Sequence, residues 1–227
     1  MRLRFYAIAF QLKASLYSVR VPVHLVDHPL VHDALVSLRD KTTPPDAFRR
    51  AATRISVLLA AEALSSVATT NVTVDTPLGP APGRRISRDV VVVPVLRAGL
   101  GMLDAVLELV PDARVGHIGL QRDEMTAVAS QYYSKLPARL DQSDVLMIDP
   151  MLATGGSAVA ALELLQQAGA QSIRMICIVA APEGVAVVER HHPGVEIYTP
   201  VVDRELNAHK YIVPGLGDFG DRLYGTI

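Results

Sequence analysis

Short apolar runs alternate with helix-forming stretches from residue 90 to residue 202, and this alternation predicts a parallel β-sheet covered by helices. The apolar runs have the length of strands buried on both faces, and they span residues 90–96, 114–120, 145–148, 173–181 and 195–202. Helices are expected between them, over residues 100–109, 158–168 and 185–191. Repeated strand–helix alternation is typical of an α/β fold with helices on both sides of the sheet.

The first part of the chain predicts a different arrangement. Residues 23–40 read as a short strand, a turn and a helix, and residues 46–64 continue with a helical pattern after Pro44 and Pro45. Residues 71–78 alternate enough for an outer strand, while residues 79–88 read as a polar loop interrupted by Pro and Gly. No regular element is expected in the hydrophilic stretch 123–142.

Composition favours one folded globular domain over residues 21–227. Hydrophobic residues make up 50% of the 227 residues and charged residues 20%, which argues against disorder. Residues 1–20 contain basic but no acidic side chains, and we interpret them as an N-terminal extension of unknown role. The apolar core of this segment is too short for a signal peptide, and no run in the chain reaches the length of a membrane span.

Charge and cysteine content exclude several classes of function. The formal net charge is −1, so we expect no nucleic-acid partner, because a phosphate backbone requires a basic surface. The single cysteine, Cys177, lies in an apolar run and predicts a buried, inert thiol.

Residues 145–157, with the sequence VLMIDPMLATGGS, predict a site for a phosphate monoester. An apolar strand ends at Asp149, because the following Pro150 cannot donate to a sheet ladder. Thr154, two glycines and Ser157 then lead into a helix, whose first N–H groups are unpaired and carry partial positive charge. The alternative is an ordinary strand-to-helix turn in which Gly relieves strain and Ser or Thr caps the helix.

Two arginines follow other strand ends of the predicted sheet. Arg97 follows the strand 90–96 and Arg122 follows the strand 114–120. Ligands of parallel sheets bind at the carboxyl ends of strands, so we expect Arg97, Arg122 and Asp149 on one edge. Either arginine alone is more often a surface charge. Their common edge is what favours anion binding.

The stretch from Asp149 to Ser157 resembles the signature of the type I phosphoribosyltransferases, and its DPMLATGGS form is similar to the uracil phosphoribosyltransferase family. Residues 93–124 (VPVLRAGLGMLDAVLELVPDARVGHIGLQRDE), the APEG segment at 181–184 and the tail from His209 to Ile227 match that family closely. The resemblance covers roughly residues 23–227. It implies a mainly parallel sheet with a small hood formed by terminal segments. It also implies transfer of a phosphoribosyl group from 5-phosphoribosyl 1-diphosphate to uracil, giving UMP and diphosphate.

The resemblance also implies roles for individual residues. Asp149, Arg97 and Asp218 are expected to be catalytic. Phosphoribosyl diphosphate is expected to contact Arg97, Arg122, Asp149, Pro150, Met151, Leu152, Ala153, Thr154, Gly155, Gly156, Ser157 and Asp218. Uracil is expected to contact Tyr211, Ile212, Gly217, Asp218 and Phe219, partly through backbone groups. No protein-bound metal is expected, because Mg²⁺ would be carried largely by the diphosphate.

The resemblance further implies a cytoplasmic homo-oligomer, dimer or tetramer, with GTP as a possible effector and no membrane partner. Two departures from the family pattern bear on the site. Phe219 replaces the usual Ala beside the base pocket, and residues 125–131, expected to form a flap over the sugar phosphate, lack the usual acidic and Pro-rich character. Two alternatives therefore stay open: transfer to another base, and a non-catalytic regulator that senses phosphoribosyl diphosphate.

Overall fold

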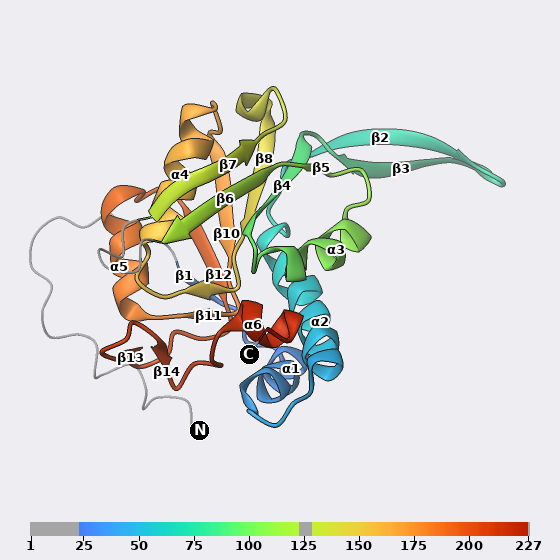
Figure 1. Cartoon of the computed structure of the whole chain (residues 1–227). Helices are drawn as coiled ribbons and strands as arrows, with labels where there is room; N and C mark the ends of the chain where they lie inside the picture. Colours follow the sequence, from blue (N-terminus) through green and yellow to red (C-terminus); the bar gives the residue numbers. More distant parts are fainter. Residues whose placement is uncertain (1–22, 123–128, 227) are drawn as a thin grey trace, which may run out of the picture.

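The structure, a computed structural model, describes residues 23–122 and 129–226, and Figure 1 shows the chain. The proposed extension, residues 1–20, and residues 125–128 of the expected flap lie outside the described residues. The strands are β1 (Val23–Leu25), β2 (Thr69–Thr76), β3 (Gly79–Ile86), β4 (Asp89–Leu96), β5 (Arg114–Val115), β6 (His117–Arg122), β7 (Ala129–Lys135), β8 (Ser143–Ile148), β9 (Met151–Leu152), β10 (Ser172–Ile176), β11 (Val179–Ala180), β12 (Glu196–Thr199), β13 (Glu205–Leu206) and β14 (Ile212–Val213). The helices are α1 (Pro29–Arg39), α2 (Pro45–Ala63), α3 (Leu100–Leu109), α4 (Gly156–Gln167), α5 (Pro182–His191) and α6 (Phe219–Tyr224), with a 3-10 turn at Leu140–Gln142.

The central sheet has the strand order β1-β12-β10-β8-β4-β6-β7, and β5 also pairs with β4. All of its pairings are parallel except that of β6 with β7. Strand β8 lies between β10 and β4, and every one of its side chains is buried. The continuous apolar run at 145–148 therefore marks a strand covered on both faces, as predicted.

Alternate residues of the strands belong to two hydrophobic cores, one on each face of the sheet. Leu146 and Ile148 pack with apolar residues of α1, α2, α3 and α6, whereas Val145 and Met147 pack with those of α4 and α5. This alternation follows from the strand geometry, in which successive side chains point to opposite faces. Figure 1 shows the same layers, with α4 and α5 on one side of the sheet and α1 to α3 on the other. The predicted α/β architecture is confirmed.

Two predicted elements were wrong, and one observed strand was not predicted. Residues 79–86, predicted as a loop, form β3, which pairs with β2 in a separate antiparallel hairpin. The hydrophilic stretch 123–142 contains the antiparallel strand β7. The predicted strand 173–181 is two strands, β10 and β11, and β11 leaves the central sheet to pair with the short β9. In each case strand pairing, rather than local apolar periodicity, decides the structure.

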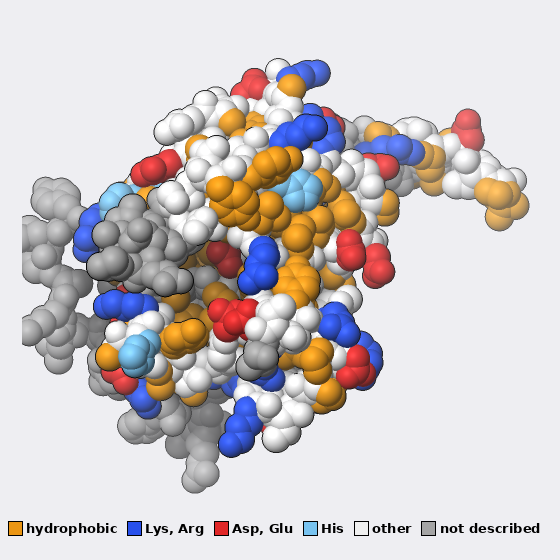
Figure 2. Space-filling view, viewed as in Figure 1, with side chains coloured by type: hydrophobic (Ala, Val, Ile, Leu, Met, Phe, Trp, Pro, Cys, Tyr) orange, Lys and Arg blue, Asp and Glu red, His pale blue; other side chains and the backbone are white. Residues whose placement is uncertain are grey.

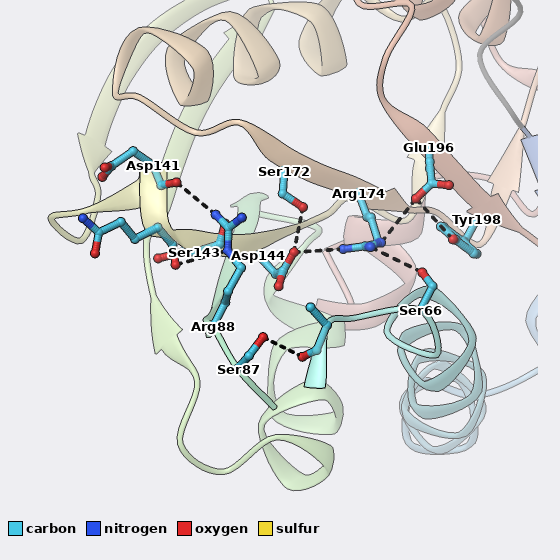
Figure 3. A network of polar contacts seen from close by, with 12 residues as sticks. Ser66, Ser87, Arg88, Asp141, Ser143, Asp144, Ser172, Arg174, Glu196 and Tyr198 are labelled. Atoms are coloured by element: carbon cyan, nitrogen blue, oxygen red, sulfur yellow. Dashed lines mark hydrogen bonds and ion pairs between the residues drawn. The ribbon is translucent and has the colours of Figure 1, made fainter. Parts of the chain in front are cut away.

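The edge of the sheet at the amino ends of the strands is tied together by buried charges (Figure 3). The guanidinium of Arg174 in β10 lies 3.3 Å from Asp144 Oδ1 of β8 and 3.3 Å from Glu196 Oε2 of β12. It also donates to Ser66 Oγ, just after α2, over 3.3 Å. Because the side chain of Arg174 is only 12% exposed, this network orders the edge opposite to the carboxyl ends of the strands.

The last part of the chain forms the predicted hood. Strands β13 and β14 make a small antiparallel pair, and α6 packs beside α2 (Figure 1). Within residues 23–122 and 129–226, none of the helices combines the length and apolar character that a membrane span requires.

Candidate active site

A cavity of about 520 Å³ opens between the carboxyl ends of the sheet strands and the hood. One wall comes from the β8–α4 connection and the other from the tail, and the lining residues are Ala98, Asp149, Met151, Leu152, Ala153, Thr154, Gly155, Ser157, Ala158, His209, Lys210, Tyr211, Ile212, Gly217, Asp218, Phe219 and Gly220. Acidic and basic side chains meet in the middle of this face of the molecule (Figure 2). Segments that are far apart in sequence thus line one cavity.

The turn before α4 requires glycine at position 155. Gly155 is the N-cap residue of α4 and has a φ of 83°, in the left-handed region that favours glycine. A Cβ atom on Gly155 would lie 2.9 Å from the carbonyl oxygen of Gly184 in α5, so this position also needs glycine for packing. The turn is therefore held against α5, and the first N–H groups of α4 are positioned at the cavity.

Asp149 lies directly after β8 and is 9% exposed. Its Oδ1 accepts a hydrogen bond from the backbone N–H of Met151 at 3.2 Å. Burial raises the pKa of this carboxyl to about 7, and the hydrogen bond from Met151 only partly opposes that rise. Asp149 is thus a carboxyl group at the cavity wall whose charge is sensitive to pH near neutrality.

The two arginines lie at the carboxyl ends of β4 and β6. Arg97 follows β4, its side chain is 65% exposed, and its Nη2 lies 3.8 Å from Asp221 Oδ1 in α6. Arg122 is the last residue of β6, and nothing is described of its side chain. Because β4, β6 and β8 run parallel, Arg97, Arg122 and Asp149 lie at or just after the carboxyl ends of these strands, at the same edge of the sheet, as the pattern predicted.

Two of the tail residues that line the cavity have buried side chains. Gly217 has no side chain, and Ile212 and Phe219 are 4% and 1% exposed. The Phe219 ring lies 5.2 Å from that of Phe48 in α2, so the bulk that replaces the usual Ala is packed into the core. Asp218 caps α6, and its Oδ1 accepts from the N–H of Asp221 at 2.9 Å.

Two polar lining residues, His209 and Lys210, were not among the predicted site residues. Lys210 has a φ of 66°, and the side-chain oxygen of Asn207 accepts hydrogen bonds from the N–H groups on both sides of it, those of His209 at 2.9 Å and Tyr211 at 3.0 Å. The sequence could have indicated His209 and Lys210, because both directly precede Tyr211, a predicted uracil contact. Pro150 and Gly156 are neighbours of the lining residues but do not line the cavity themselves.

Comparisons with known proteins decide the family. The chain matches the family described as Uracil phosphoribosyltransferase over residues 25–226. The chain belongs to the uracil phosphoribosyltransferase family.

Individual uracil phosphoribosyltransferases are also similar to this chain in sequence over most of its length. A uracil phosphoribosyltransferase of Dictyoglomus thermophilum is 51% identical over 205 residues, which are 90% of this chain and 99% of that protein. One from Rhodococcus opacus is 50% identical over 205 residues, 90% of this chain and 98% of that protein. The solved structure of the AQ2163 protein from Aquifex aeolicus has a TM-score of 0.85 and 36% identity, and the match covers 89% of this chain and 97% of that one. This structural match and the mainly parallel central sheet confirm the α/β fold predicted from the resemblance.

Proposed function

We propose that this protein transfers the phosphoribosyl group of 5-phosphoribosyl 1-diphosphate to uracil, forming UMP and diphosphate. The observation that carries the proposal is the single cavity between the turn before α4 and the tail residues 211–219. One wall offers N–H groups for a phosphate and the other offers backbone groups for a base. The family of the chain supports the same reaction.

The 5-phosphate is assigned to the turn from Thr154 to Ser157. A helix N-terminus binds phosphate through unpaired N–H groups and the positive end of the helix dipole. The assignment includes the neighbouring residues Pro150, Met151, Leu152, Ala153, Gly155 and Gly156, which shape this connection.

Asp149 is assigned to the ribose. As the bond between C1 and the diphosphate oxygen breaks, its electron pair leaves with the diphosphate and positive charge develops on the ring. An ionised Asp149 accepts from the ribose hydroxyls and offsets that charge. Uracil N1 then bonds to C1, and the proton on N1 passes to the departing diphosphate. Asp218, on the opposite wall, is assigned to the same substrate.

The diphosphate is assigned to Arg97 and Arg122. Guanidinium groups stay charged and match pairs of phosphate oxygens. Arg97 is largely exposed and its acidic neighbour Asp221 is 3.8 Å away, so its guanidinium can turn toward an anion. Among the described residues that line the cavity, Lys210 is the one Lys or Arg, and we assign it to the same negative charge.

Magnesium is proposed to arrive on the substrate. Among the described residues no three His, Cys, Asp or Glu side chains converge as metal ligands, while Asp149 and Asp218 both line the cavity. Two carboxylates supply too few oxygens for a six-coordinate Mg²⁺, and diphosphate oxygens complete such a shell. The bound cation would neutralise charge on the leaving group.

Uracil is assigned to Tyr211, Ile212, Gly217, Asp218 and Phe219. Uracil presents two carbonyl oxygens and two N–H groups, which backbone amides and carbonyls complement. The Phe219 ring is buried and packs against Phe48, so the bulk that replaces the usual Ala is compatible with uracil in this pocket.

The test is direct. Protein, Mg²⁺ and phosphoribosyl diphosphate are mixed with uracil, and UMP and diphosphate are measured; cytosine, adenine, guanine and hypoxanthine serve as competing bases. Among these bases, only uracil is expected to cause release of diphosphate. Release with another base only, or RNA binding without turnover, would contradict the proposal.

Three further proposals rest on the family resemblance: a homo-oligomer, a cytoplasmic location and activation by GTP. The oligomer has separate support from the hairpin β2–β3, whose strands pair only with each other within the described part of the chain and extend away from the body (Figure 1). A two-stranded hairpin is at best marginally stable in water, so contact with a second subunit would stabilise it. Initial rates measured with and without GTP test the effector.

A further inference from the structure

The backbone N–H and carbonyl groups of Gly215, in the tail, are both held by one largely buried ion pair. The N–H of Gly215 donates to Asp203 Oδ2 at 2.9 Å, and its carbonyl oxygen accepts from Arg39 Nη1 at 3.3 Å. Arg39 and Asp203 also bind each other through two contacts, Nη2 to Oδ1 at 2.7 Å and Nη1 to Oδ2 at 3.1 Å. The four contacts form a closed ring, which we call the Gly215 clamp.

Both side chains of the clamp stand on rigid parts of the molecule. Arg39 is the last residue of α1 and its side chain is 25% exposed, while the side chain of Asp203 is 4% exposed. The N–H of Asp203 donates to the carbonyl oxygen of Ala180 at 2.8 Å, and the preceding Val202 pairs with Ala180 in parallel fashion. The clamp therefore ties the tail to α1 and to β11 together.

The clamped loop has few other means of holding its shape. Gly215 and Gly217 both have positive φ values, 58° and 81°, and neither has a side chain that could pack. A Cβ atom on Gly215 would lie 2.2 Å from the carbonyl oxygen of Ile212, so no other residue fits there. Leu216 is buried, and its carbonyl oxygen accepts from Arg222 at 2.7 Å. Side-chain contacts made from outside the loop thus determine where its backbone lies.

We propose that Asp203 and Arg39 are positioning residues for the base, which set uracil affinity through the Gly215 peptide without touching uracil. The inference rests on the proposed function and deepens it. Backbone groups recognise a base only if the loop itself is held in place, because a backbone amide has no rotamer with which to adjust. Neither Asp203 nor Arg39 lines the cavity, so their effect must pass through the loop.

The clamp should affect uracil more than phosphoribosyl diphosphate. The phosphate turn at Thr154–Ser157 belongs to another element, and Asp218 is fixed separately as the cap of α6. Loss of a hydrogen bond to a buried charge typically weakens an interaction by roughly ten- to a hundredfold. A selective loss of uracil affinity is the signature that separates positioning from general damage to the fold.

The experiment compares wild type, Asp203→Asn, Arg39→Lys and the control Asp33→Asn. Asp203→Asn keeps the shape but removes the charge, and Arg39→Lys keeps the charge but removes the planar fork. Asp33 is also on α1, and its exposed pair with Arg54 at 2.9 Å lies away from the tail loop. For both clamp variants we expect KM for uracil to rise about tenfold or more, KM for phosphoribosyl diphosphate to change less than about threefold, and the control to match wild type.

A second measurement needs no substrate. Hydrogen exchange of peptides that contain residues 212–218 should become faster in both clamp variants, while peptides from α4 keep their wild-type rates. If the Asp203→Asn variant no longer unfolds cooperatively on heating, the Arg39→Lys variant tests the proposal instead, because the side chain of Arg39 is partly exposed. Equal rises of both KM values would contradict the positioning role of Asp203 and Arg39. An unchanged KM for uracil together with unchanged hydrogen exchange would also contradict it. If the wild-type protein is inactive with uracil, the proposed function is refuted. The hydrogen-exchange rates would still show whether the clamp holds residues 212–218 in place.

Discussion

Asp149 shows how burial changes the chemistry of a single residue. It lies at the end of a fully buried strand, and its carboxyl, with its pKa raised to about 7, keeps its proton until near neutrality in the folded protein. The unfolded chain loses that proton near pH 3.8, the ordinary pKa for Asp. The folded state therefore binds more protons between these values, so the contribution of this residue to stability falls as the pH rises from about 4 to about 7.

Replacing Asp149 by Asn should separate stability from activity. Asn resembles the protonated carboxyl, so the variant and wild type should have similar free energies of unfolding below about pH 4. At about pH 8 the variant should be more stable, by an upper limit of about 4 kcal/mol for a pKa raised to about 7. Turnover should fall on the order of a hundred- to a thousandfold, because the neutral amide cannot offset charge on the ribose. Denaturant unfolding at both pH values and initial rates check the two effects; near-normal turnover would refute the assigned role.

Arg97 should act on one substrate only. Its exposed guanidinium makes a loose contact with Asp221, so Arg97→Ala should leave the melting temperature nearly unchanged. We expect phosphoribosyl diphosphate to bind roughly ten- to a hundredfold more weakly, because a charged hydrogen-bond partner is lost, while the binding of uracil changes little. Calorimetric titration with each substrate measures both. Equal losses for the two ligands would count against the assignment.

At the scale of elements, α6 depends on aromatic contacts with α2. The Phe219 ring at its start packs against Phe48 of α2, and the guanidinium of Arg222 lies over the Phe48 ring, 4.4 Å from its centroid. These contacts link the last helix to the core on the α1–α3 side of the sheet, and through Asp218 they hold one wall of the cavity. From the sequence, Phe219 was a departure from the family pattern and an expected uracil contact, not a predicted core residue.

Phe219→Ala should lower the free energy of unfolding by about 3–5 kcal/mol, as large-to-small changes in cores do. Phe219→Leu should cost less, since most of the buried volume is kept. Urea unfolding curves of both variants provide the measurement. A ring that occupied the base pocket instead would leave stability almost unchanged in both variants, and that result would contradict the packing of Phe219 against Phe48.

At the scale of the whole molecule, the hairpin β2–β3 stands apart from the body. Its residues are mostly exposed, including Val74 at 40%, Ile86 at 48% and Leu78 at its tip at 101%. Exposed apolar side chains on an extended hairpin favour an interface, which is the basis for placing the subunit contact there.

Replacing Val74 and Leu78 together by Ser should weaken the assembly without unfolding the subunit, because neither side chain belongs to the two cores. Light scattering coupled to size-exclusion chromatography should show a lower mass for the variant than for wild type at equal concentration. Val36→Ser, at a position 69% exposed on α1, is the matched control and should keep the wild-type mass. An unchanged mass for the hairpin variant would place the interface elsewhere.

The local pattern of the chain determined those parts of the molecule that depend on neighbours in sequence. Apolar runs predicted the buried strands, and the acid, two glycines and hydroxyls around residues 149–157 predicted a strand end and a helix start. Parallel strands place such residues at one edge, so the strand pattern was enough to group Arg97, Arg122 and Asp149. The resemblance supplied the tail residues, which composition alone would have described as a loop.

Only the tertiary structure decided what depends on contacts between distant segments. Strand β11 leaves the central sheet because it pairs with the short β9, which precedes α4 in the sequence. Arg39 and Asp203 are 164 positions apart, and nothing local to either residue indicates their partner. The raised pKa of Asp149 and the burial of Phe219 likewise arise from groups that folding brings around them, because desolvation is a property of the packed molecule and not of the residue.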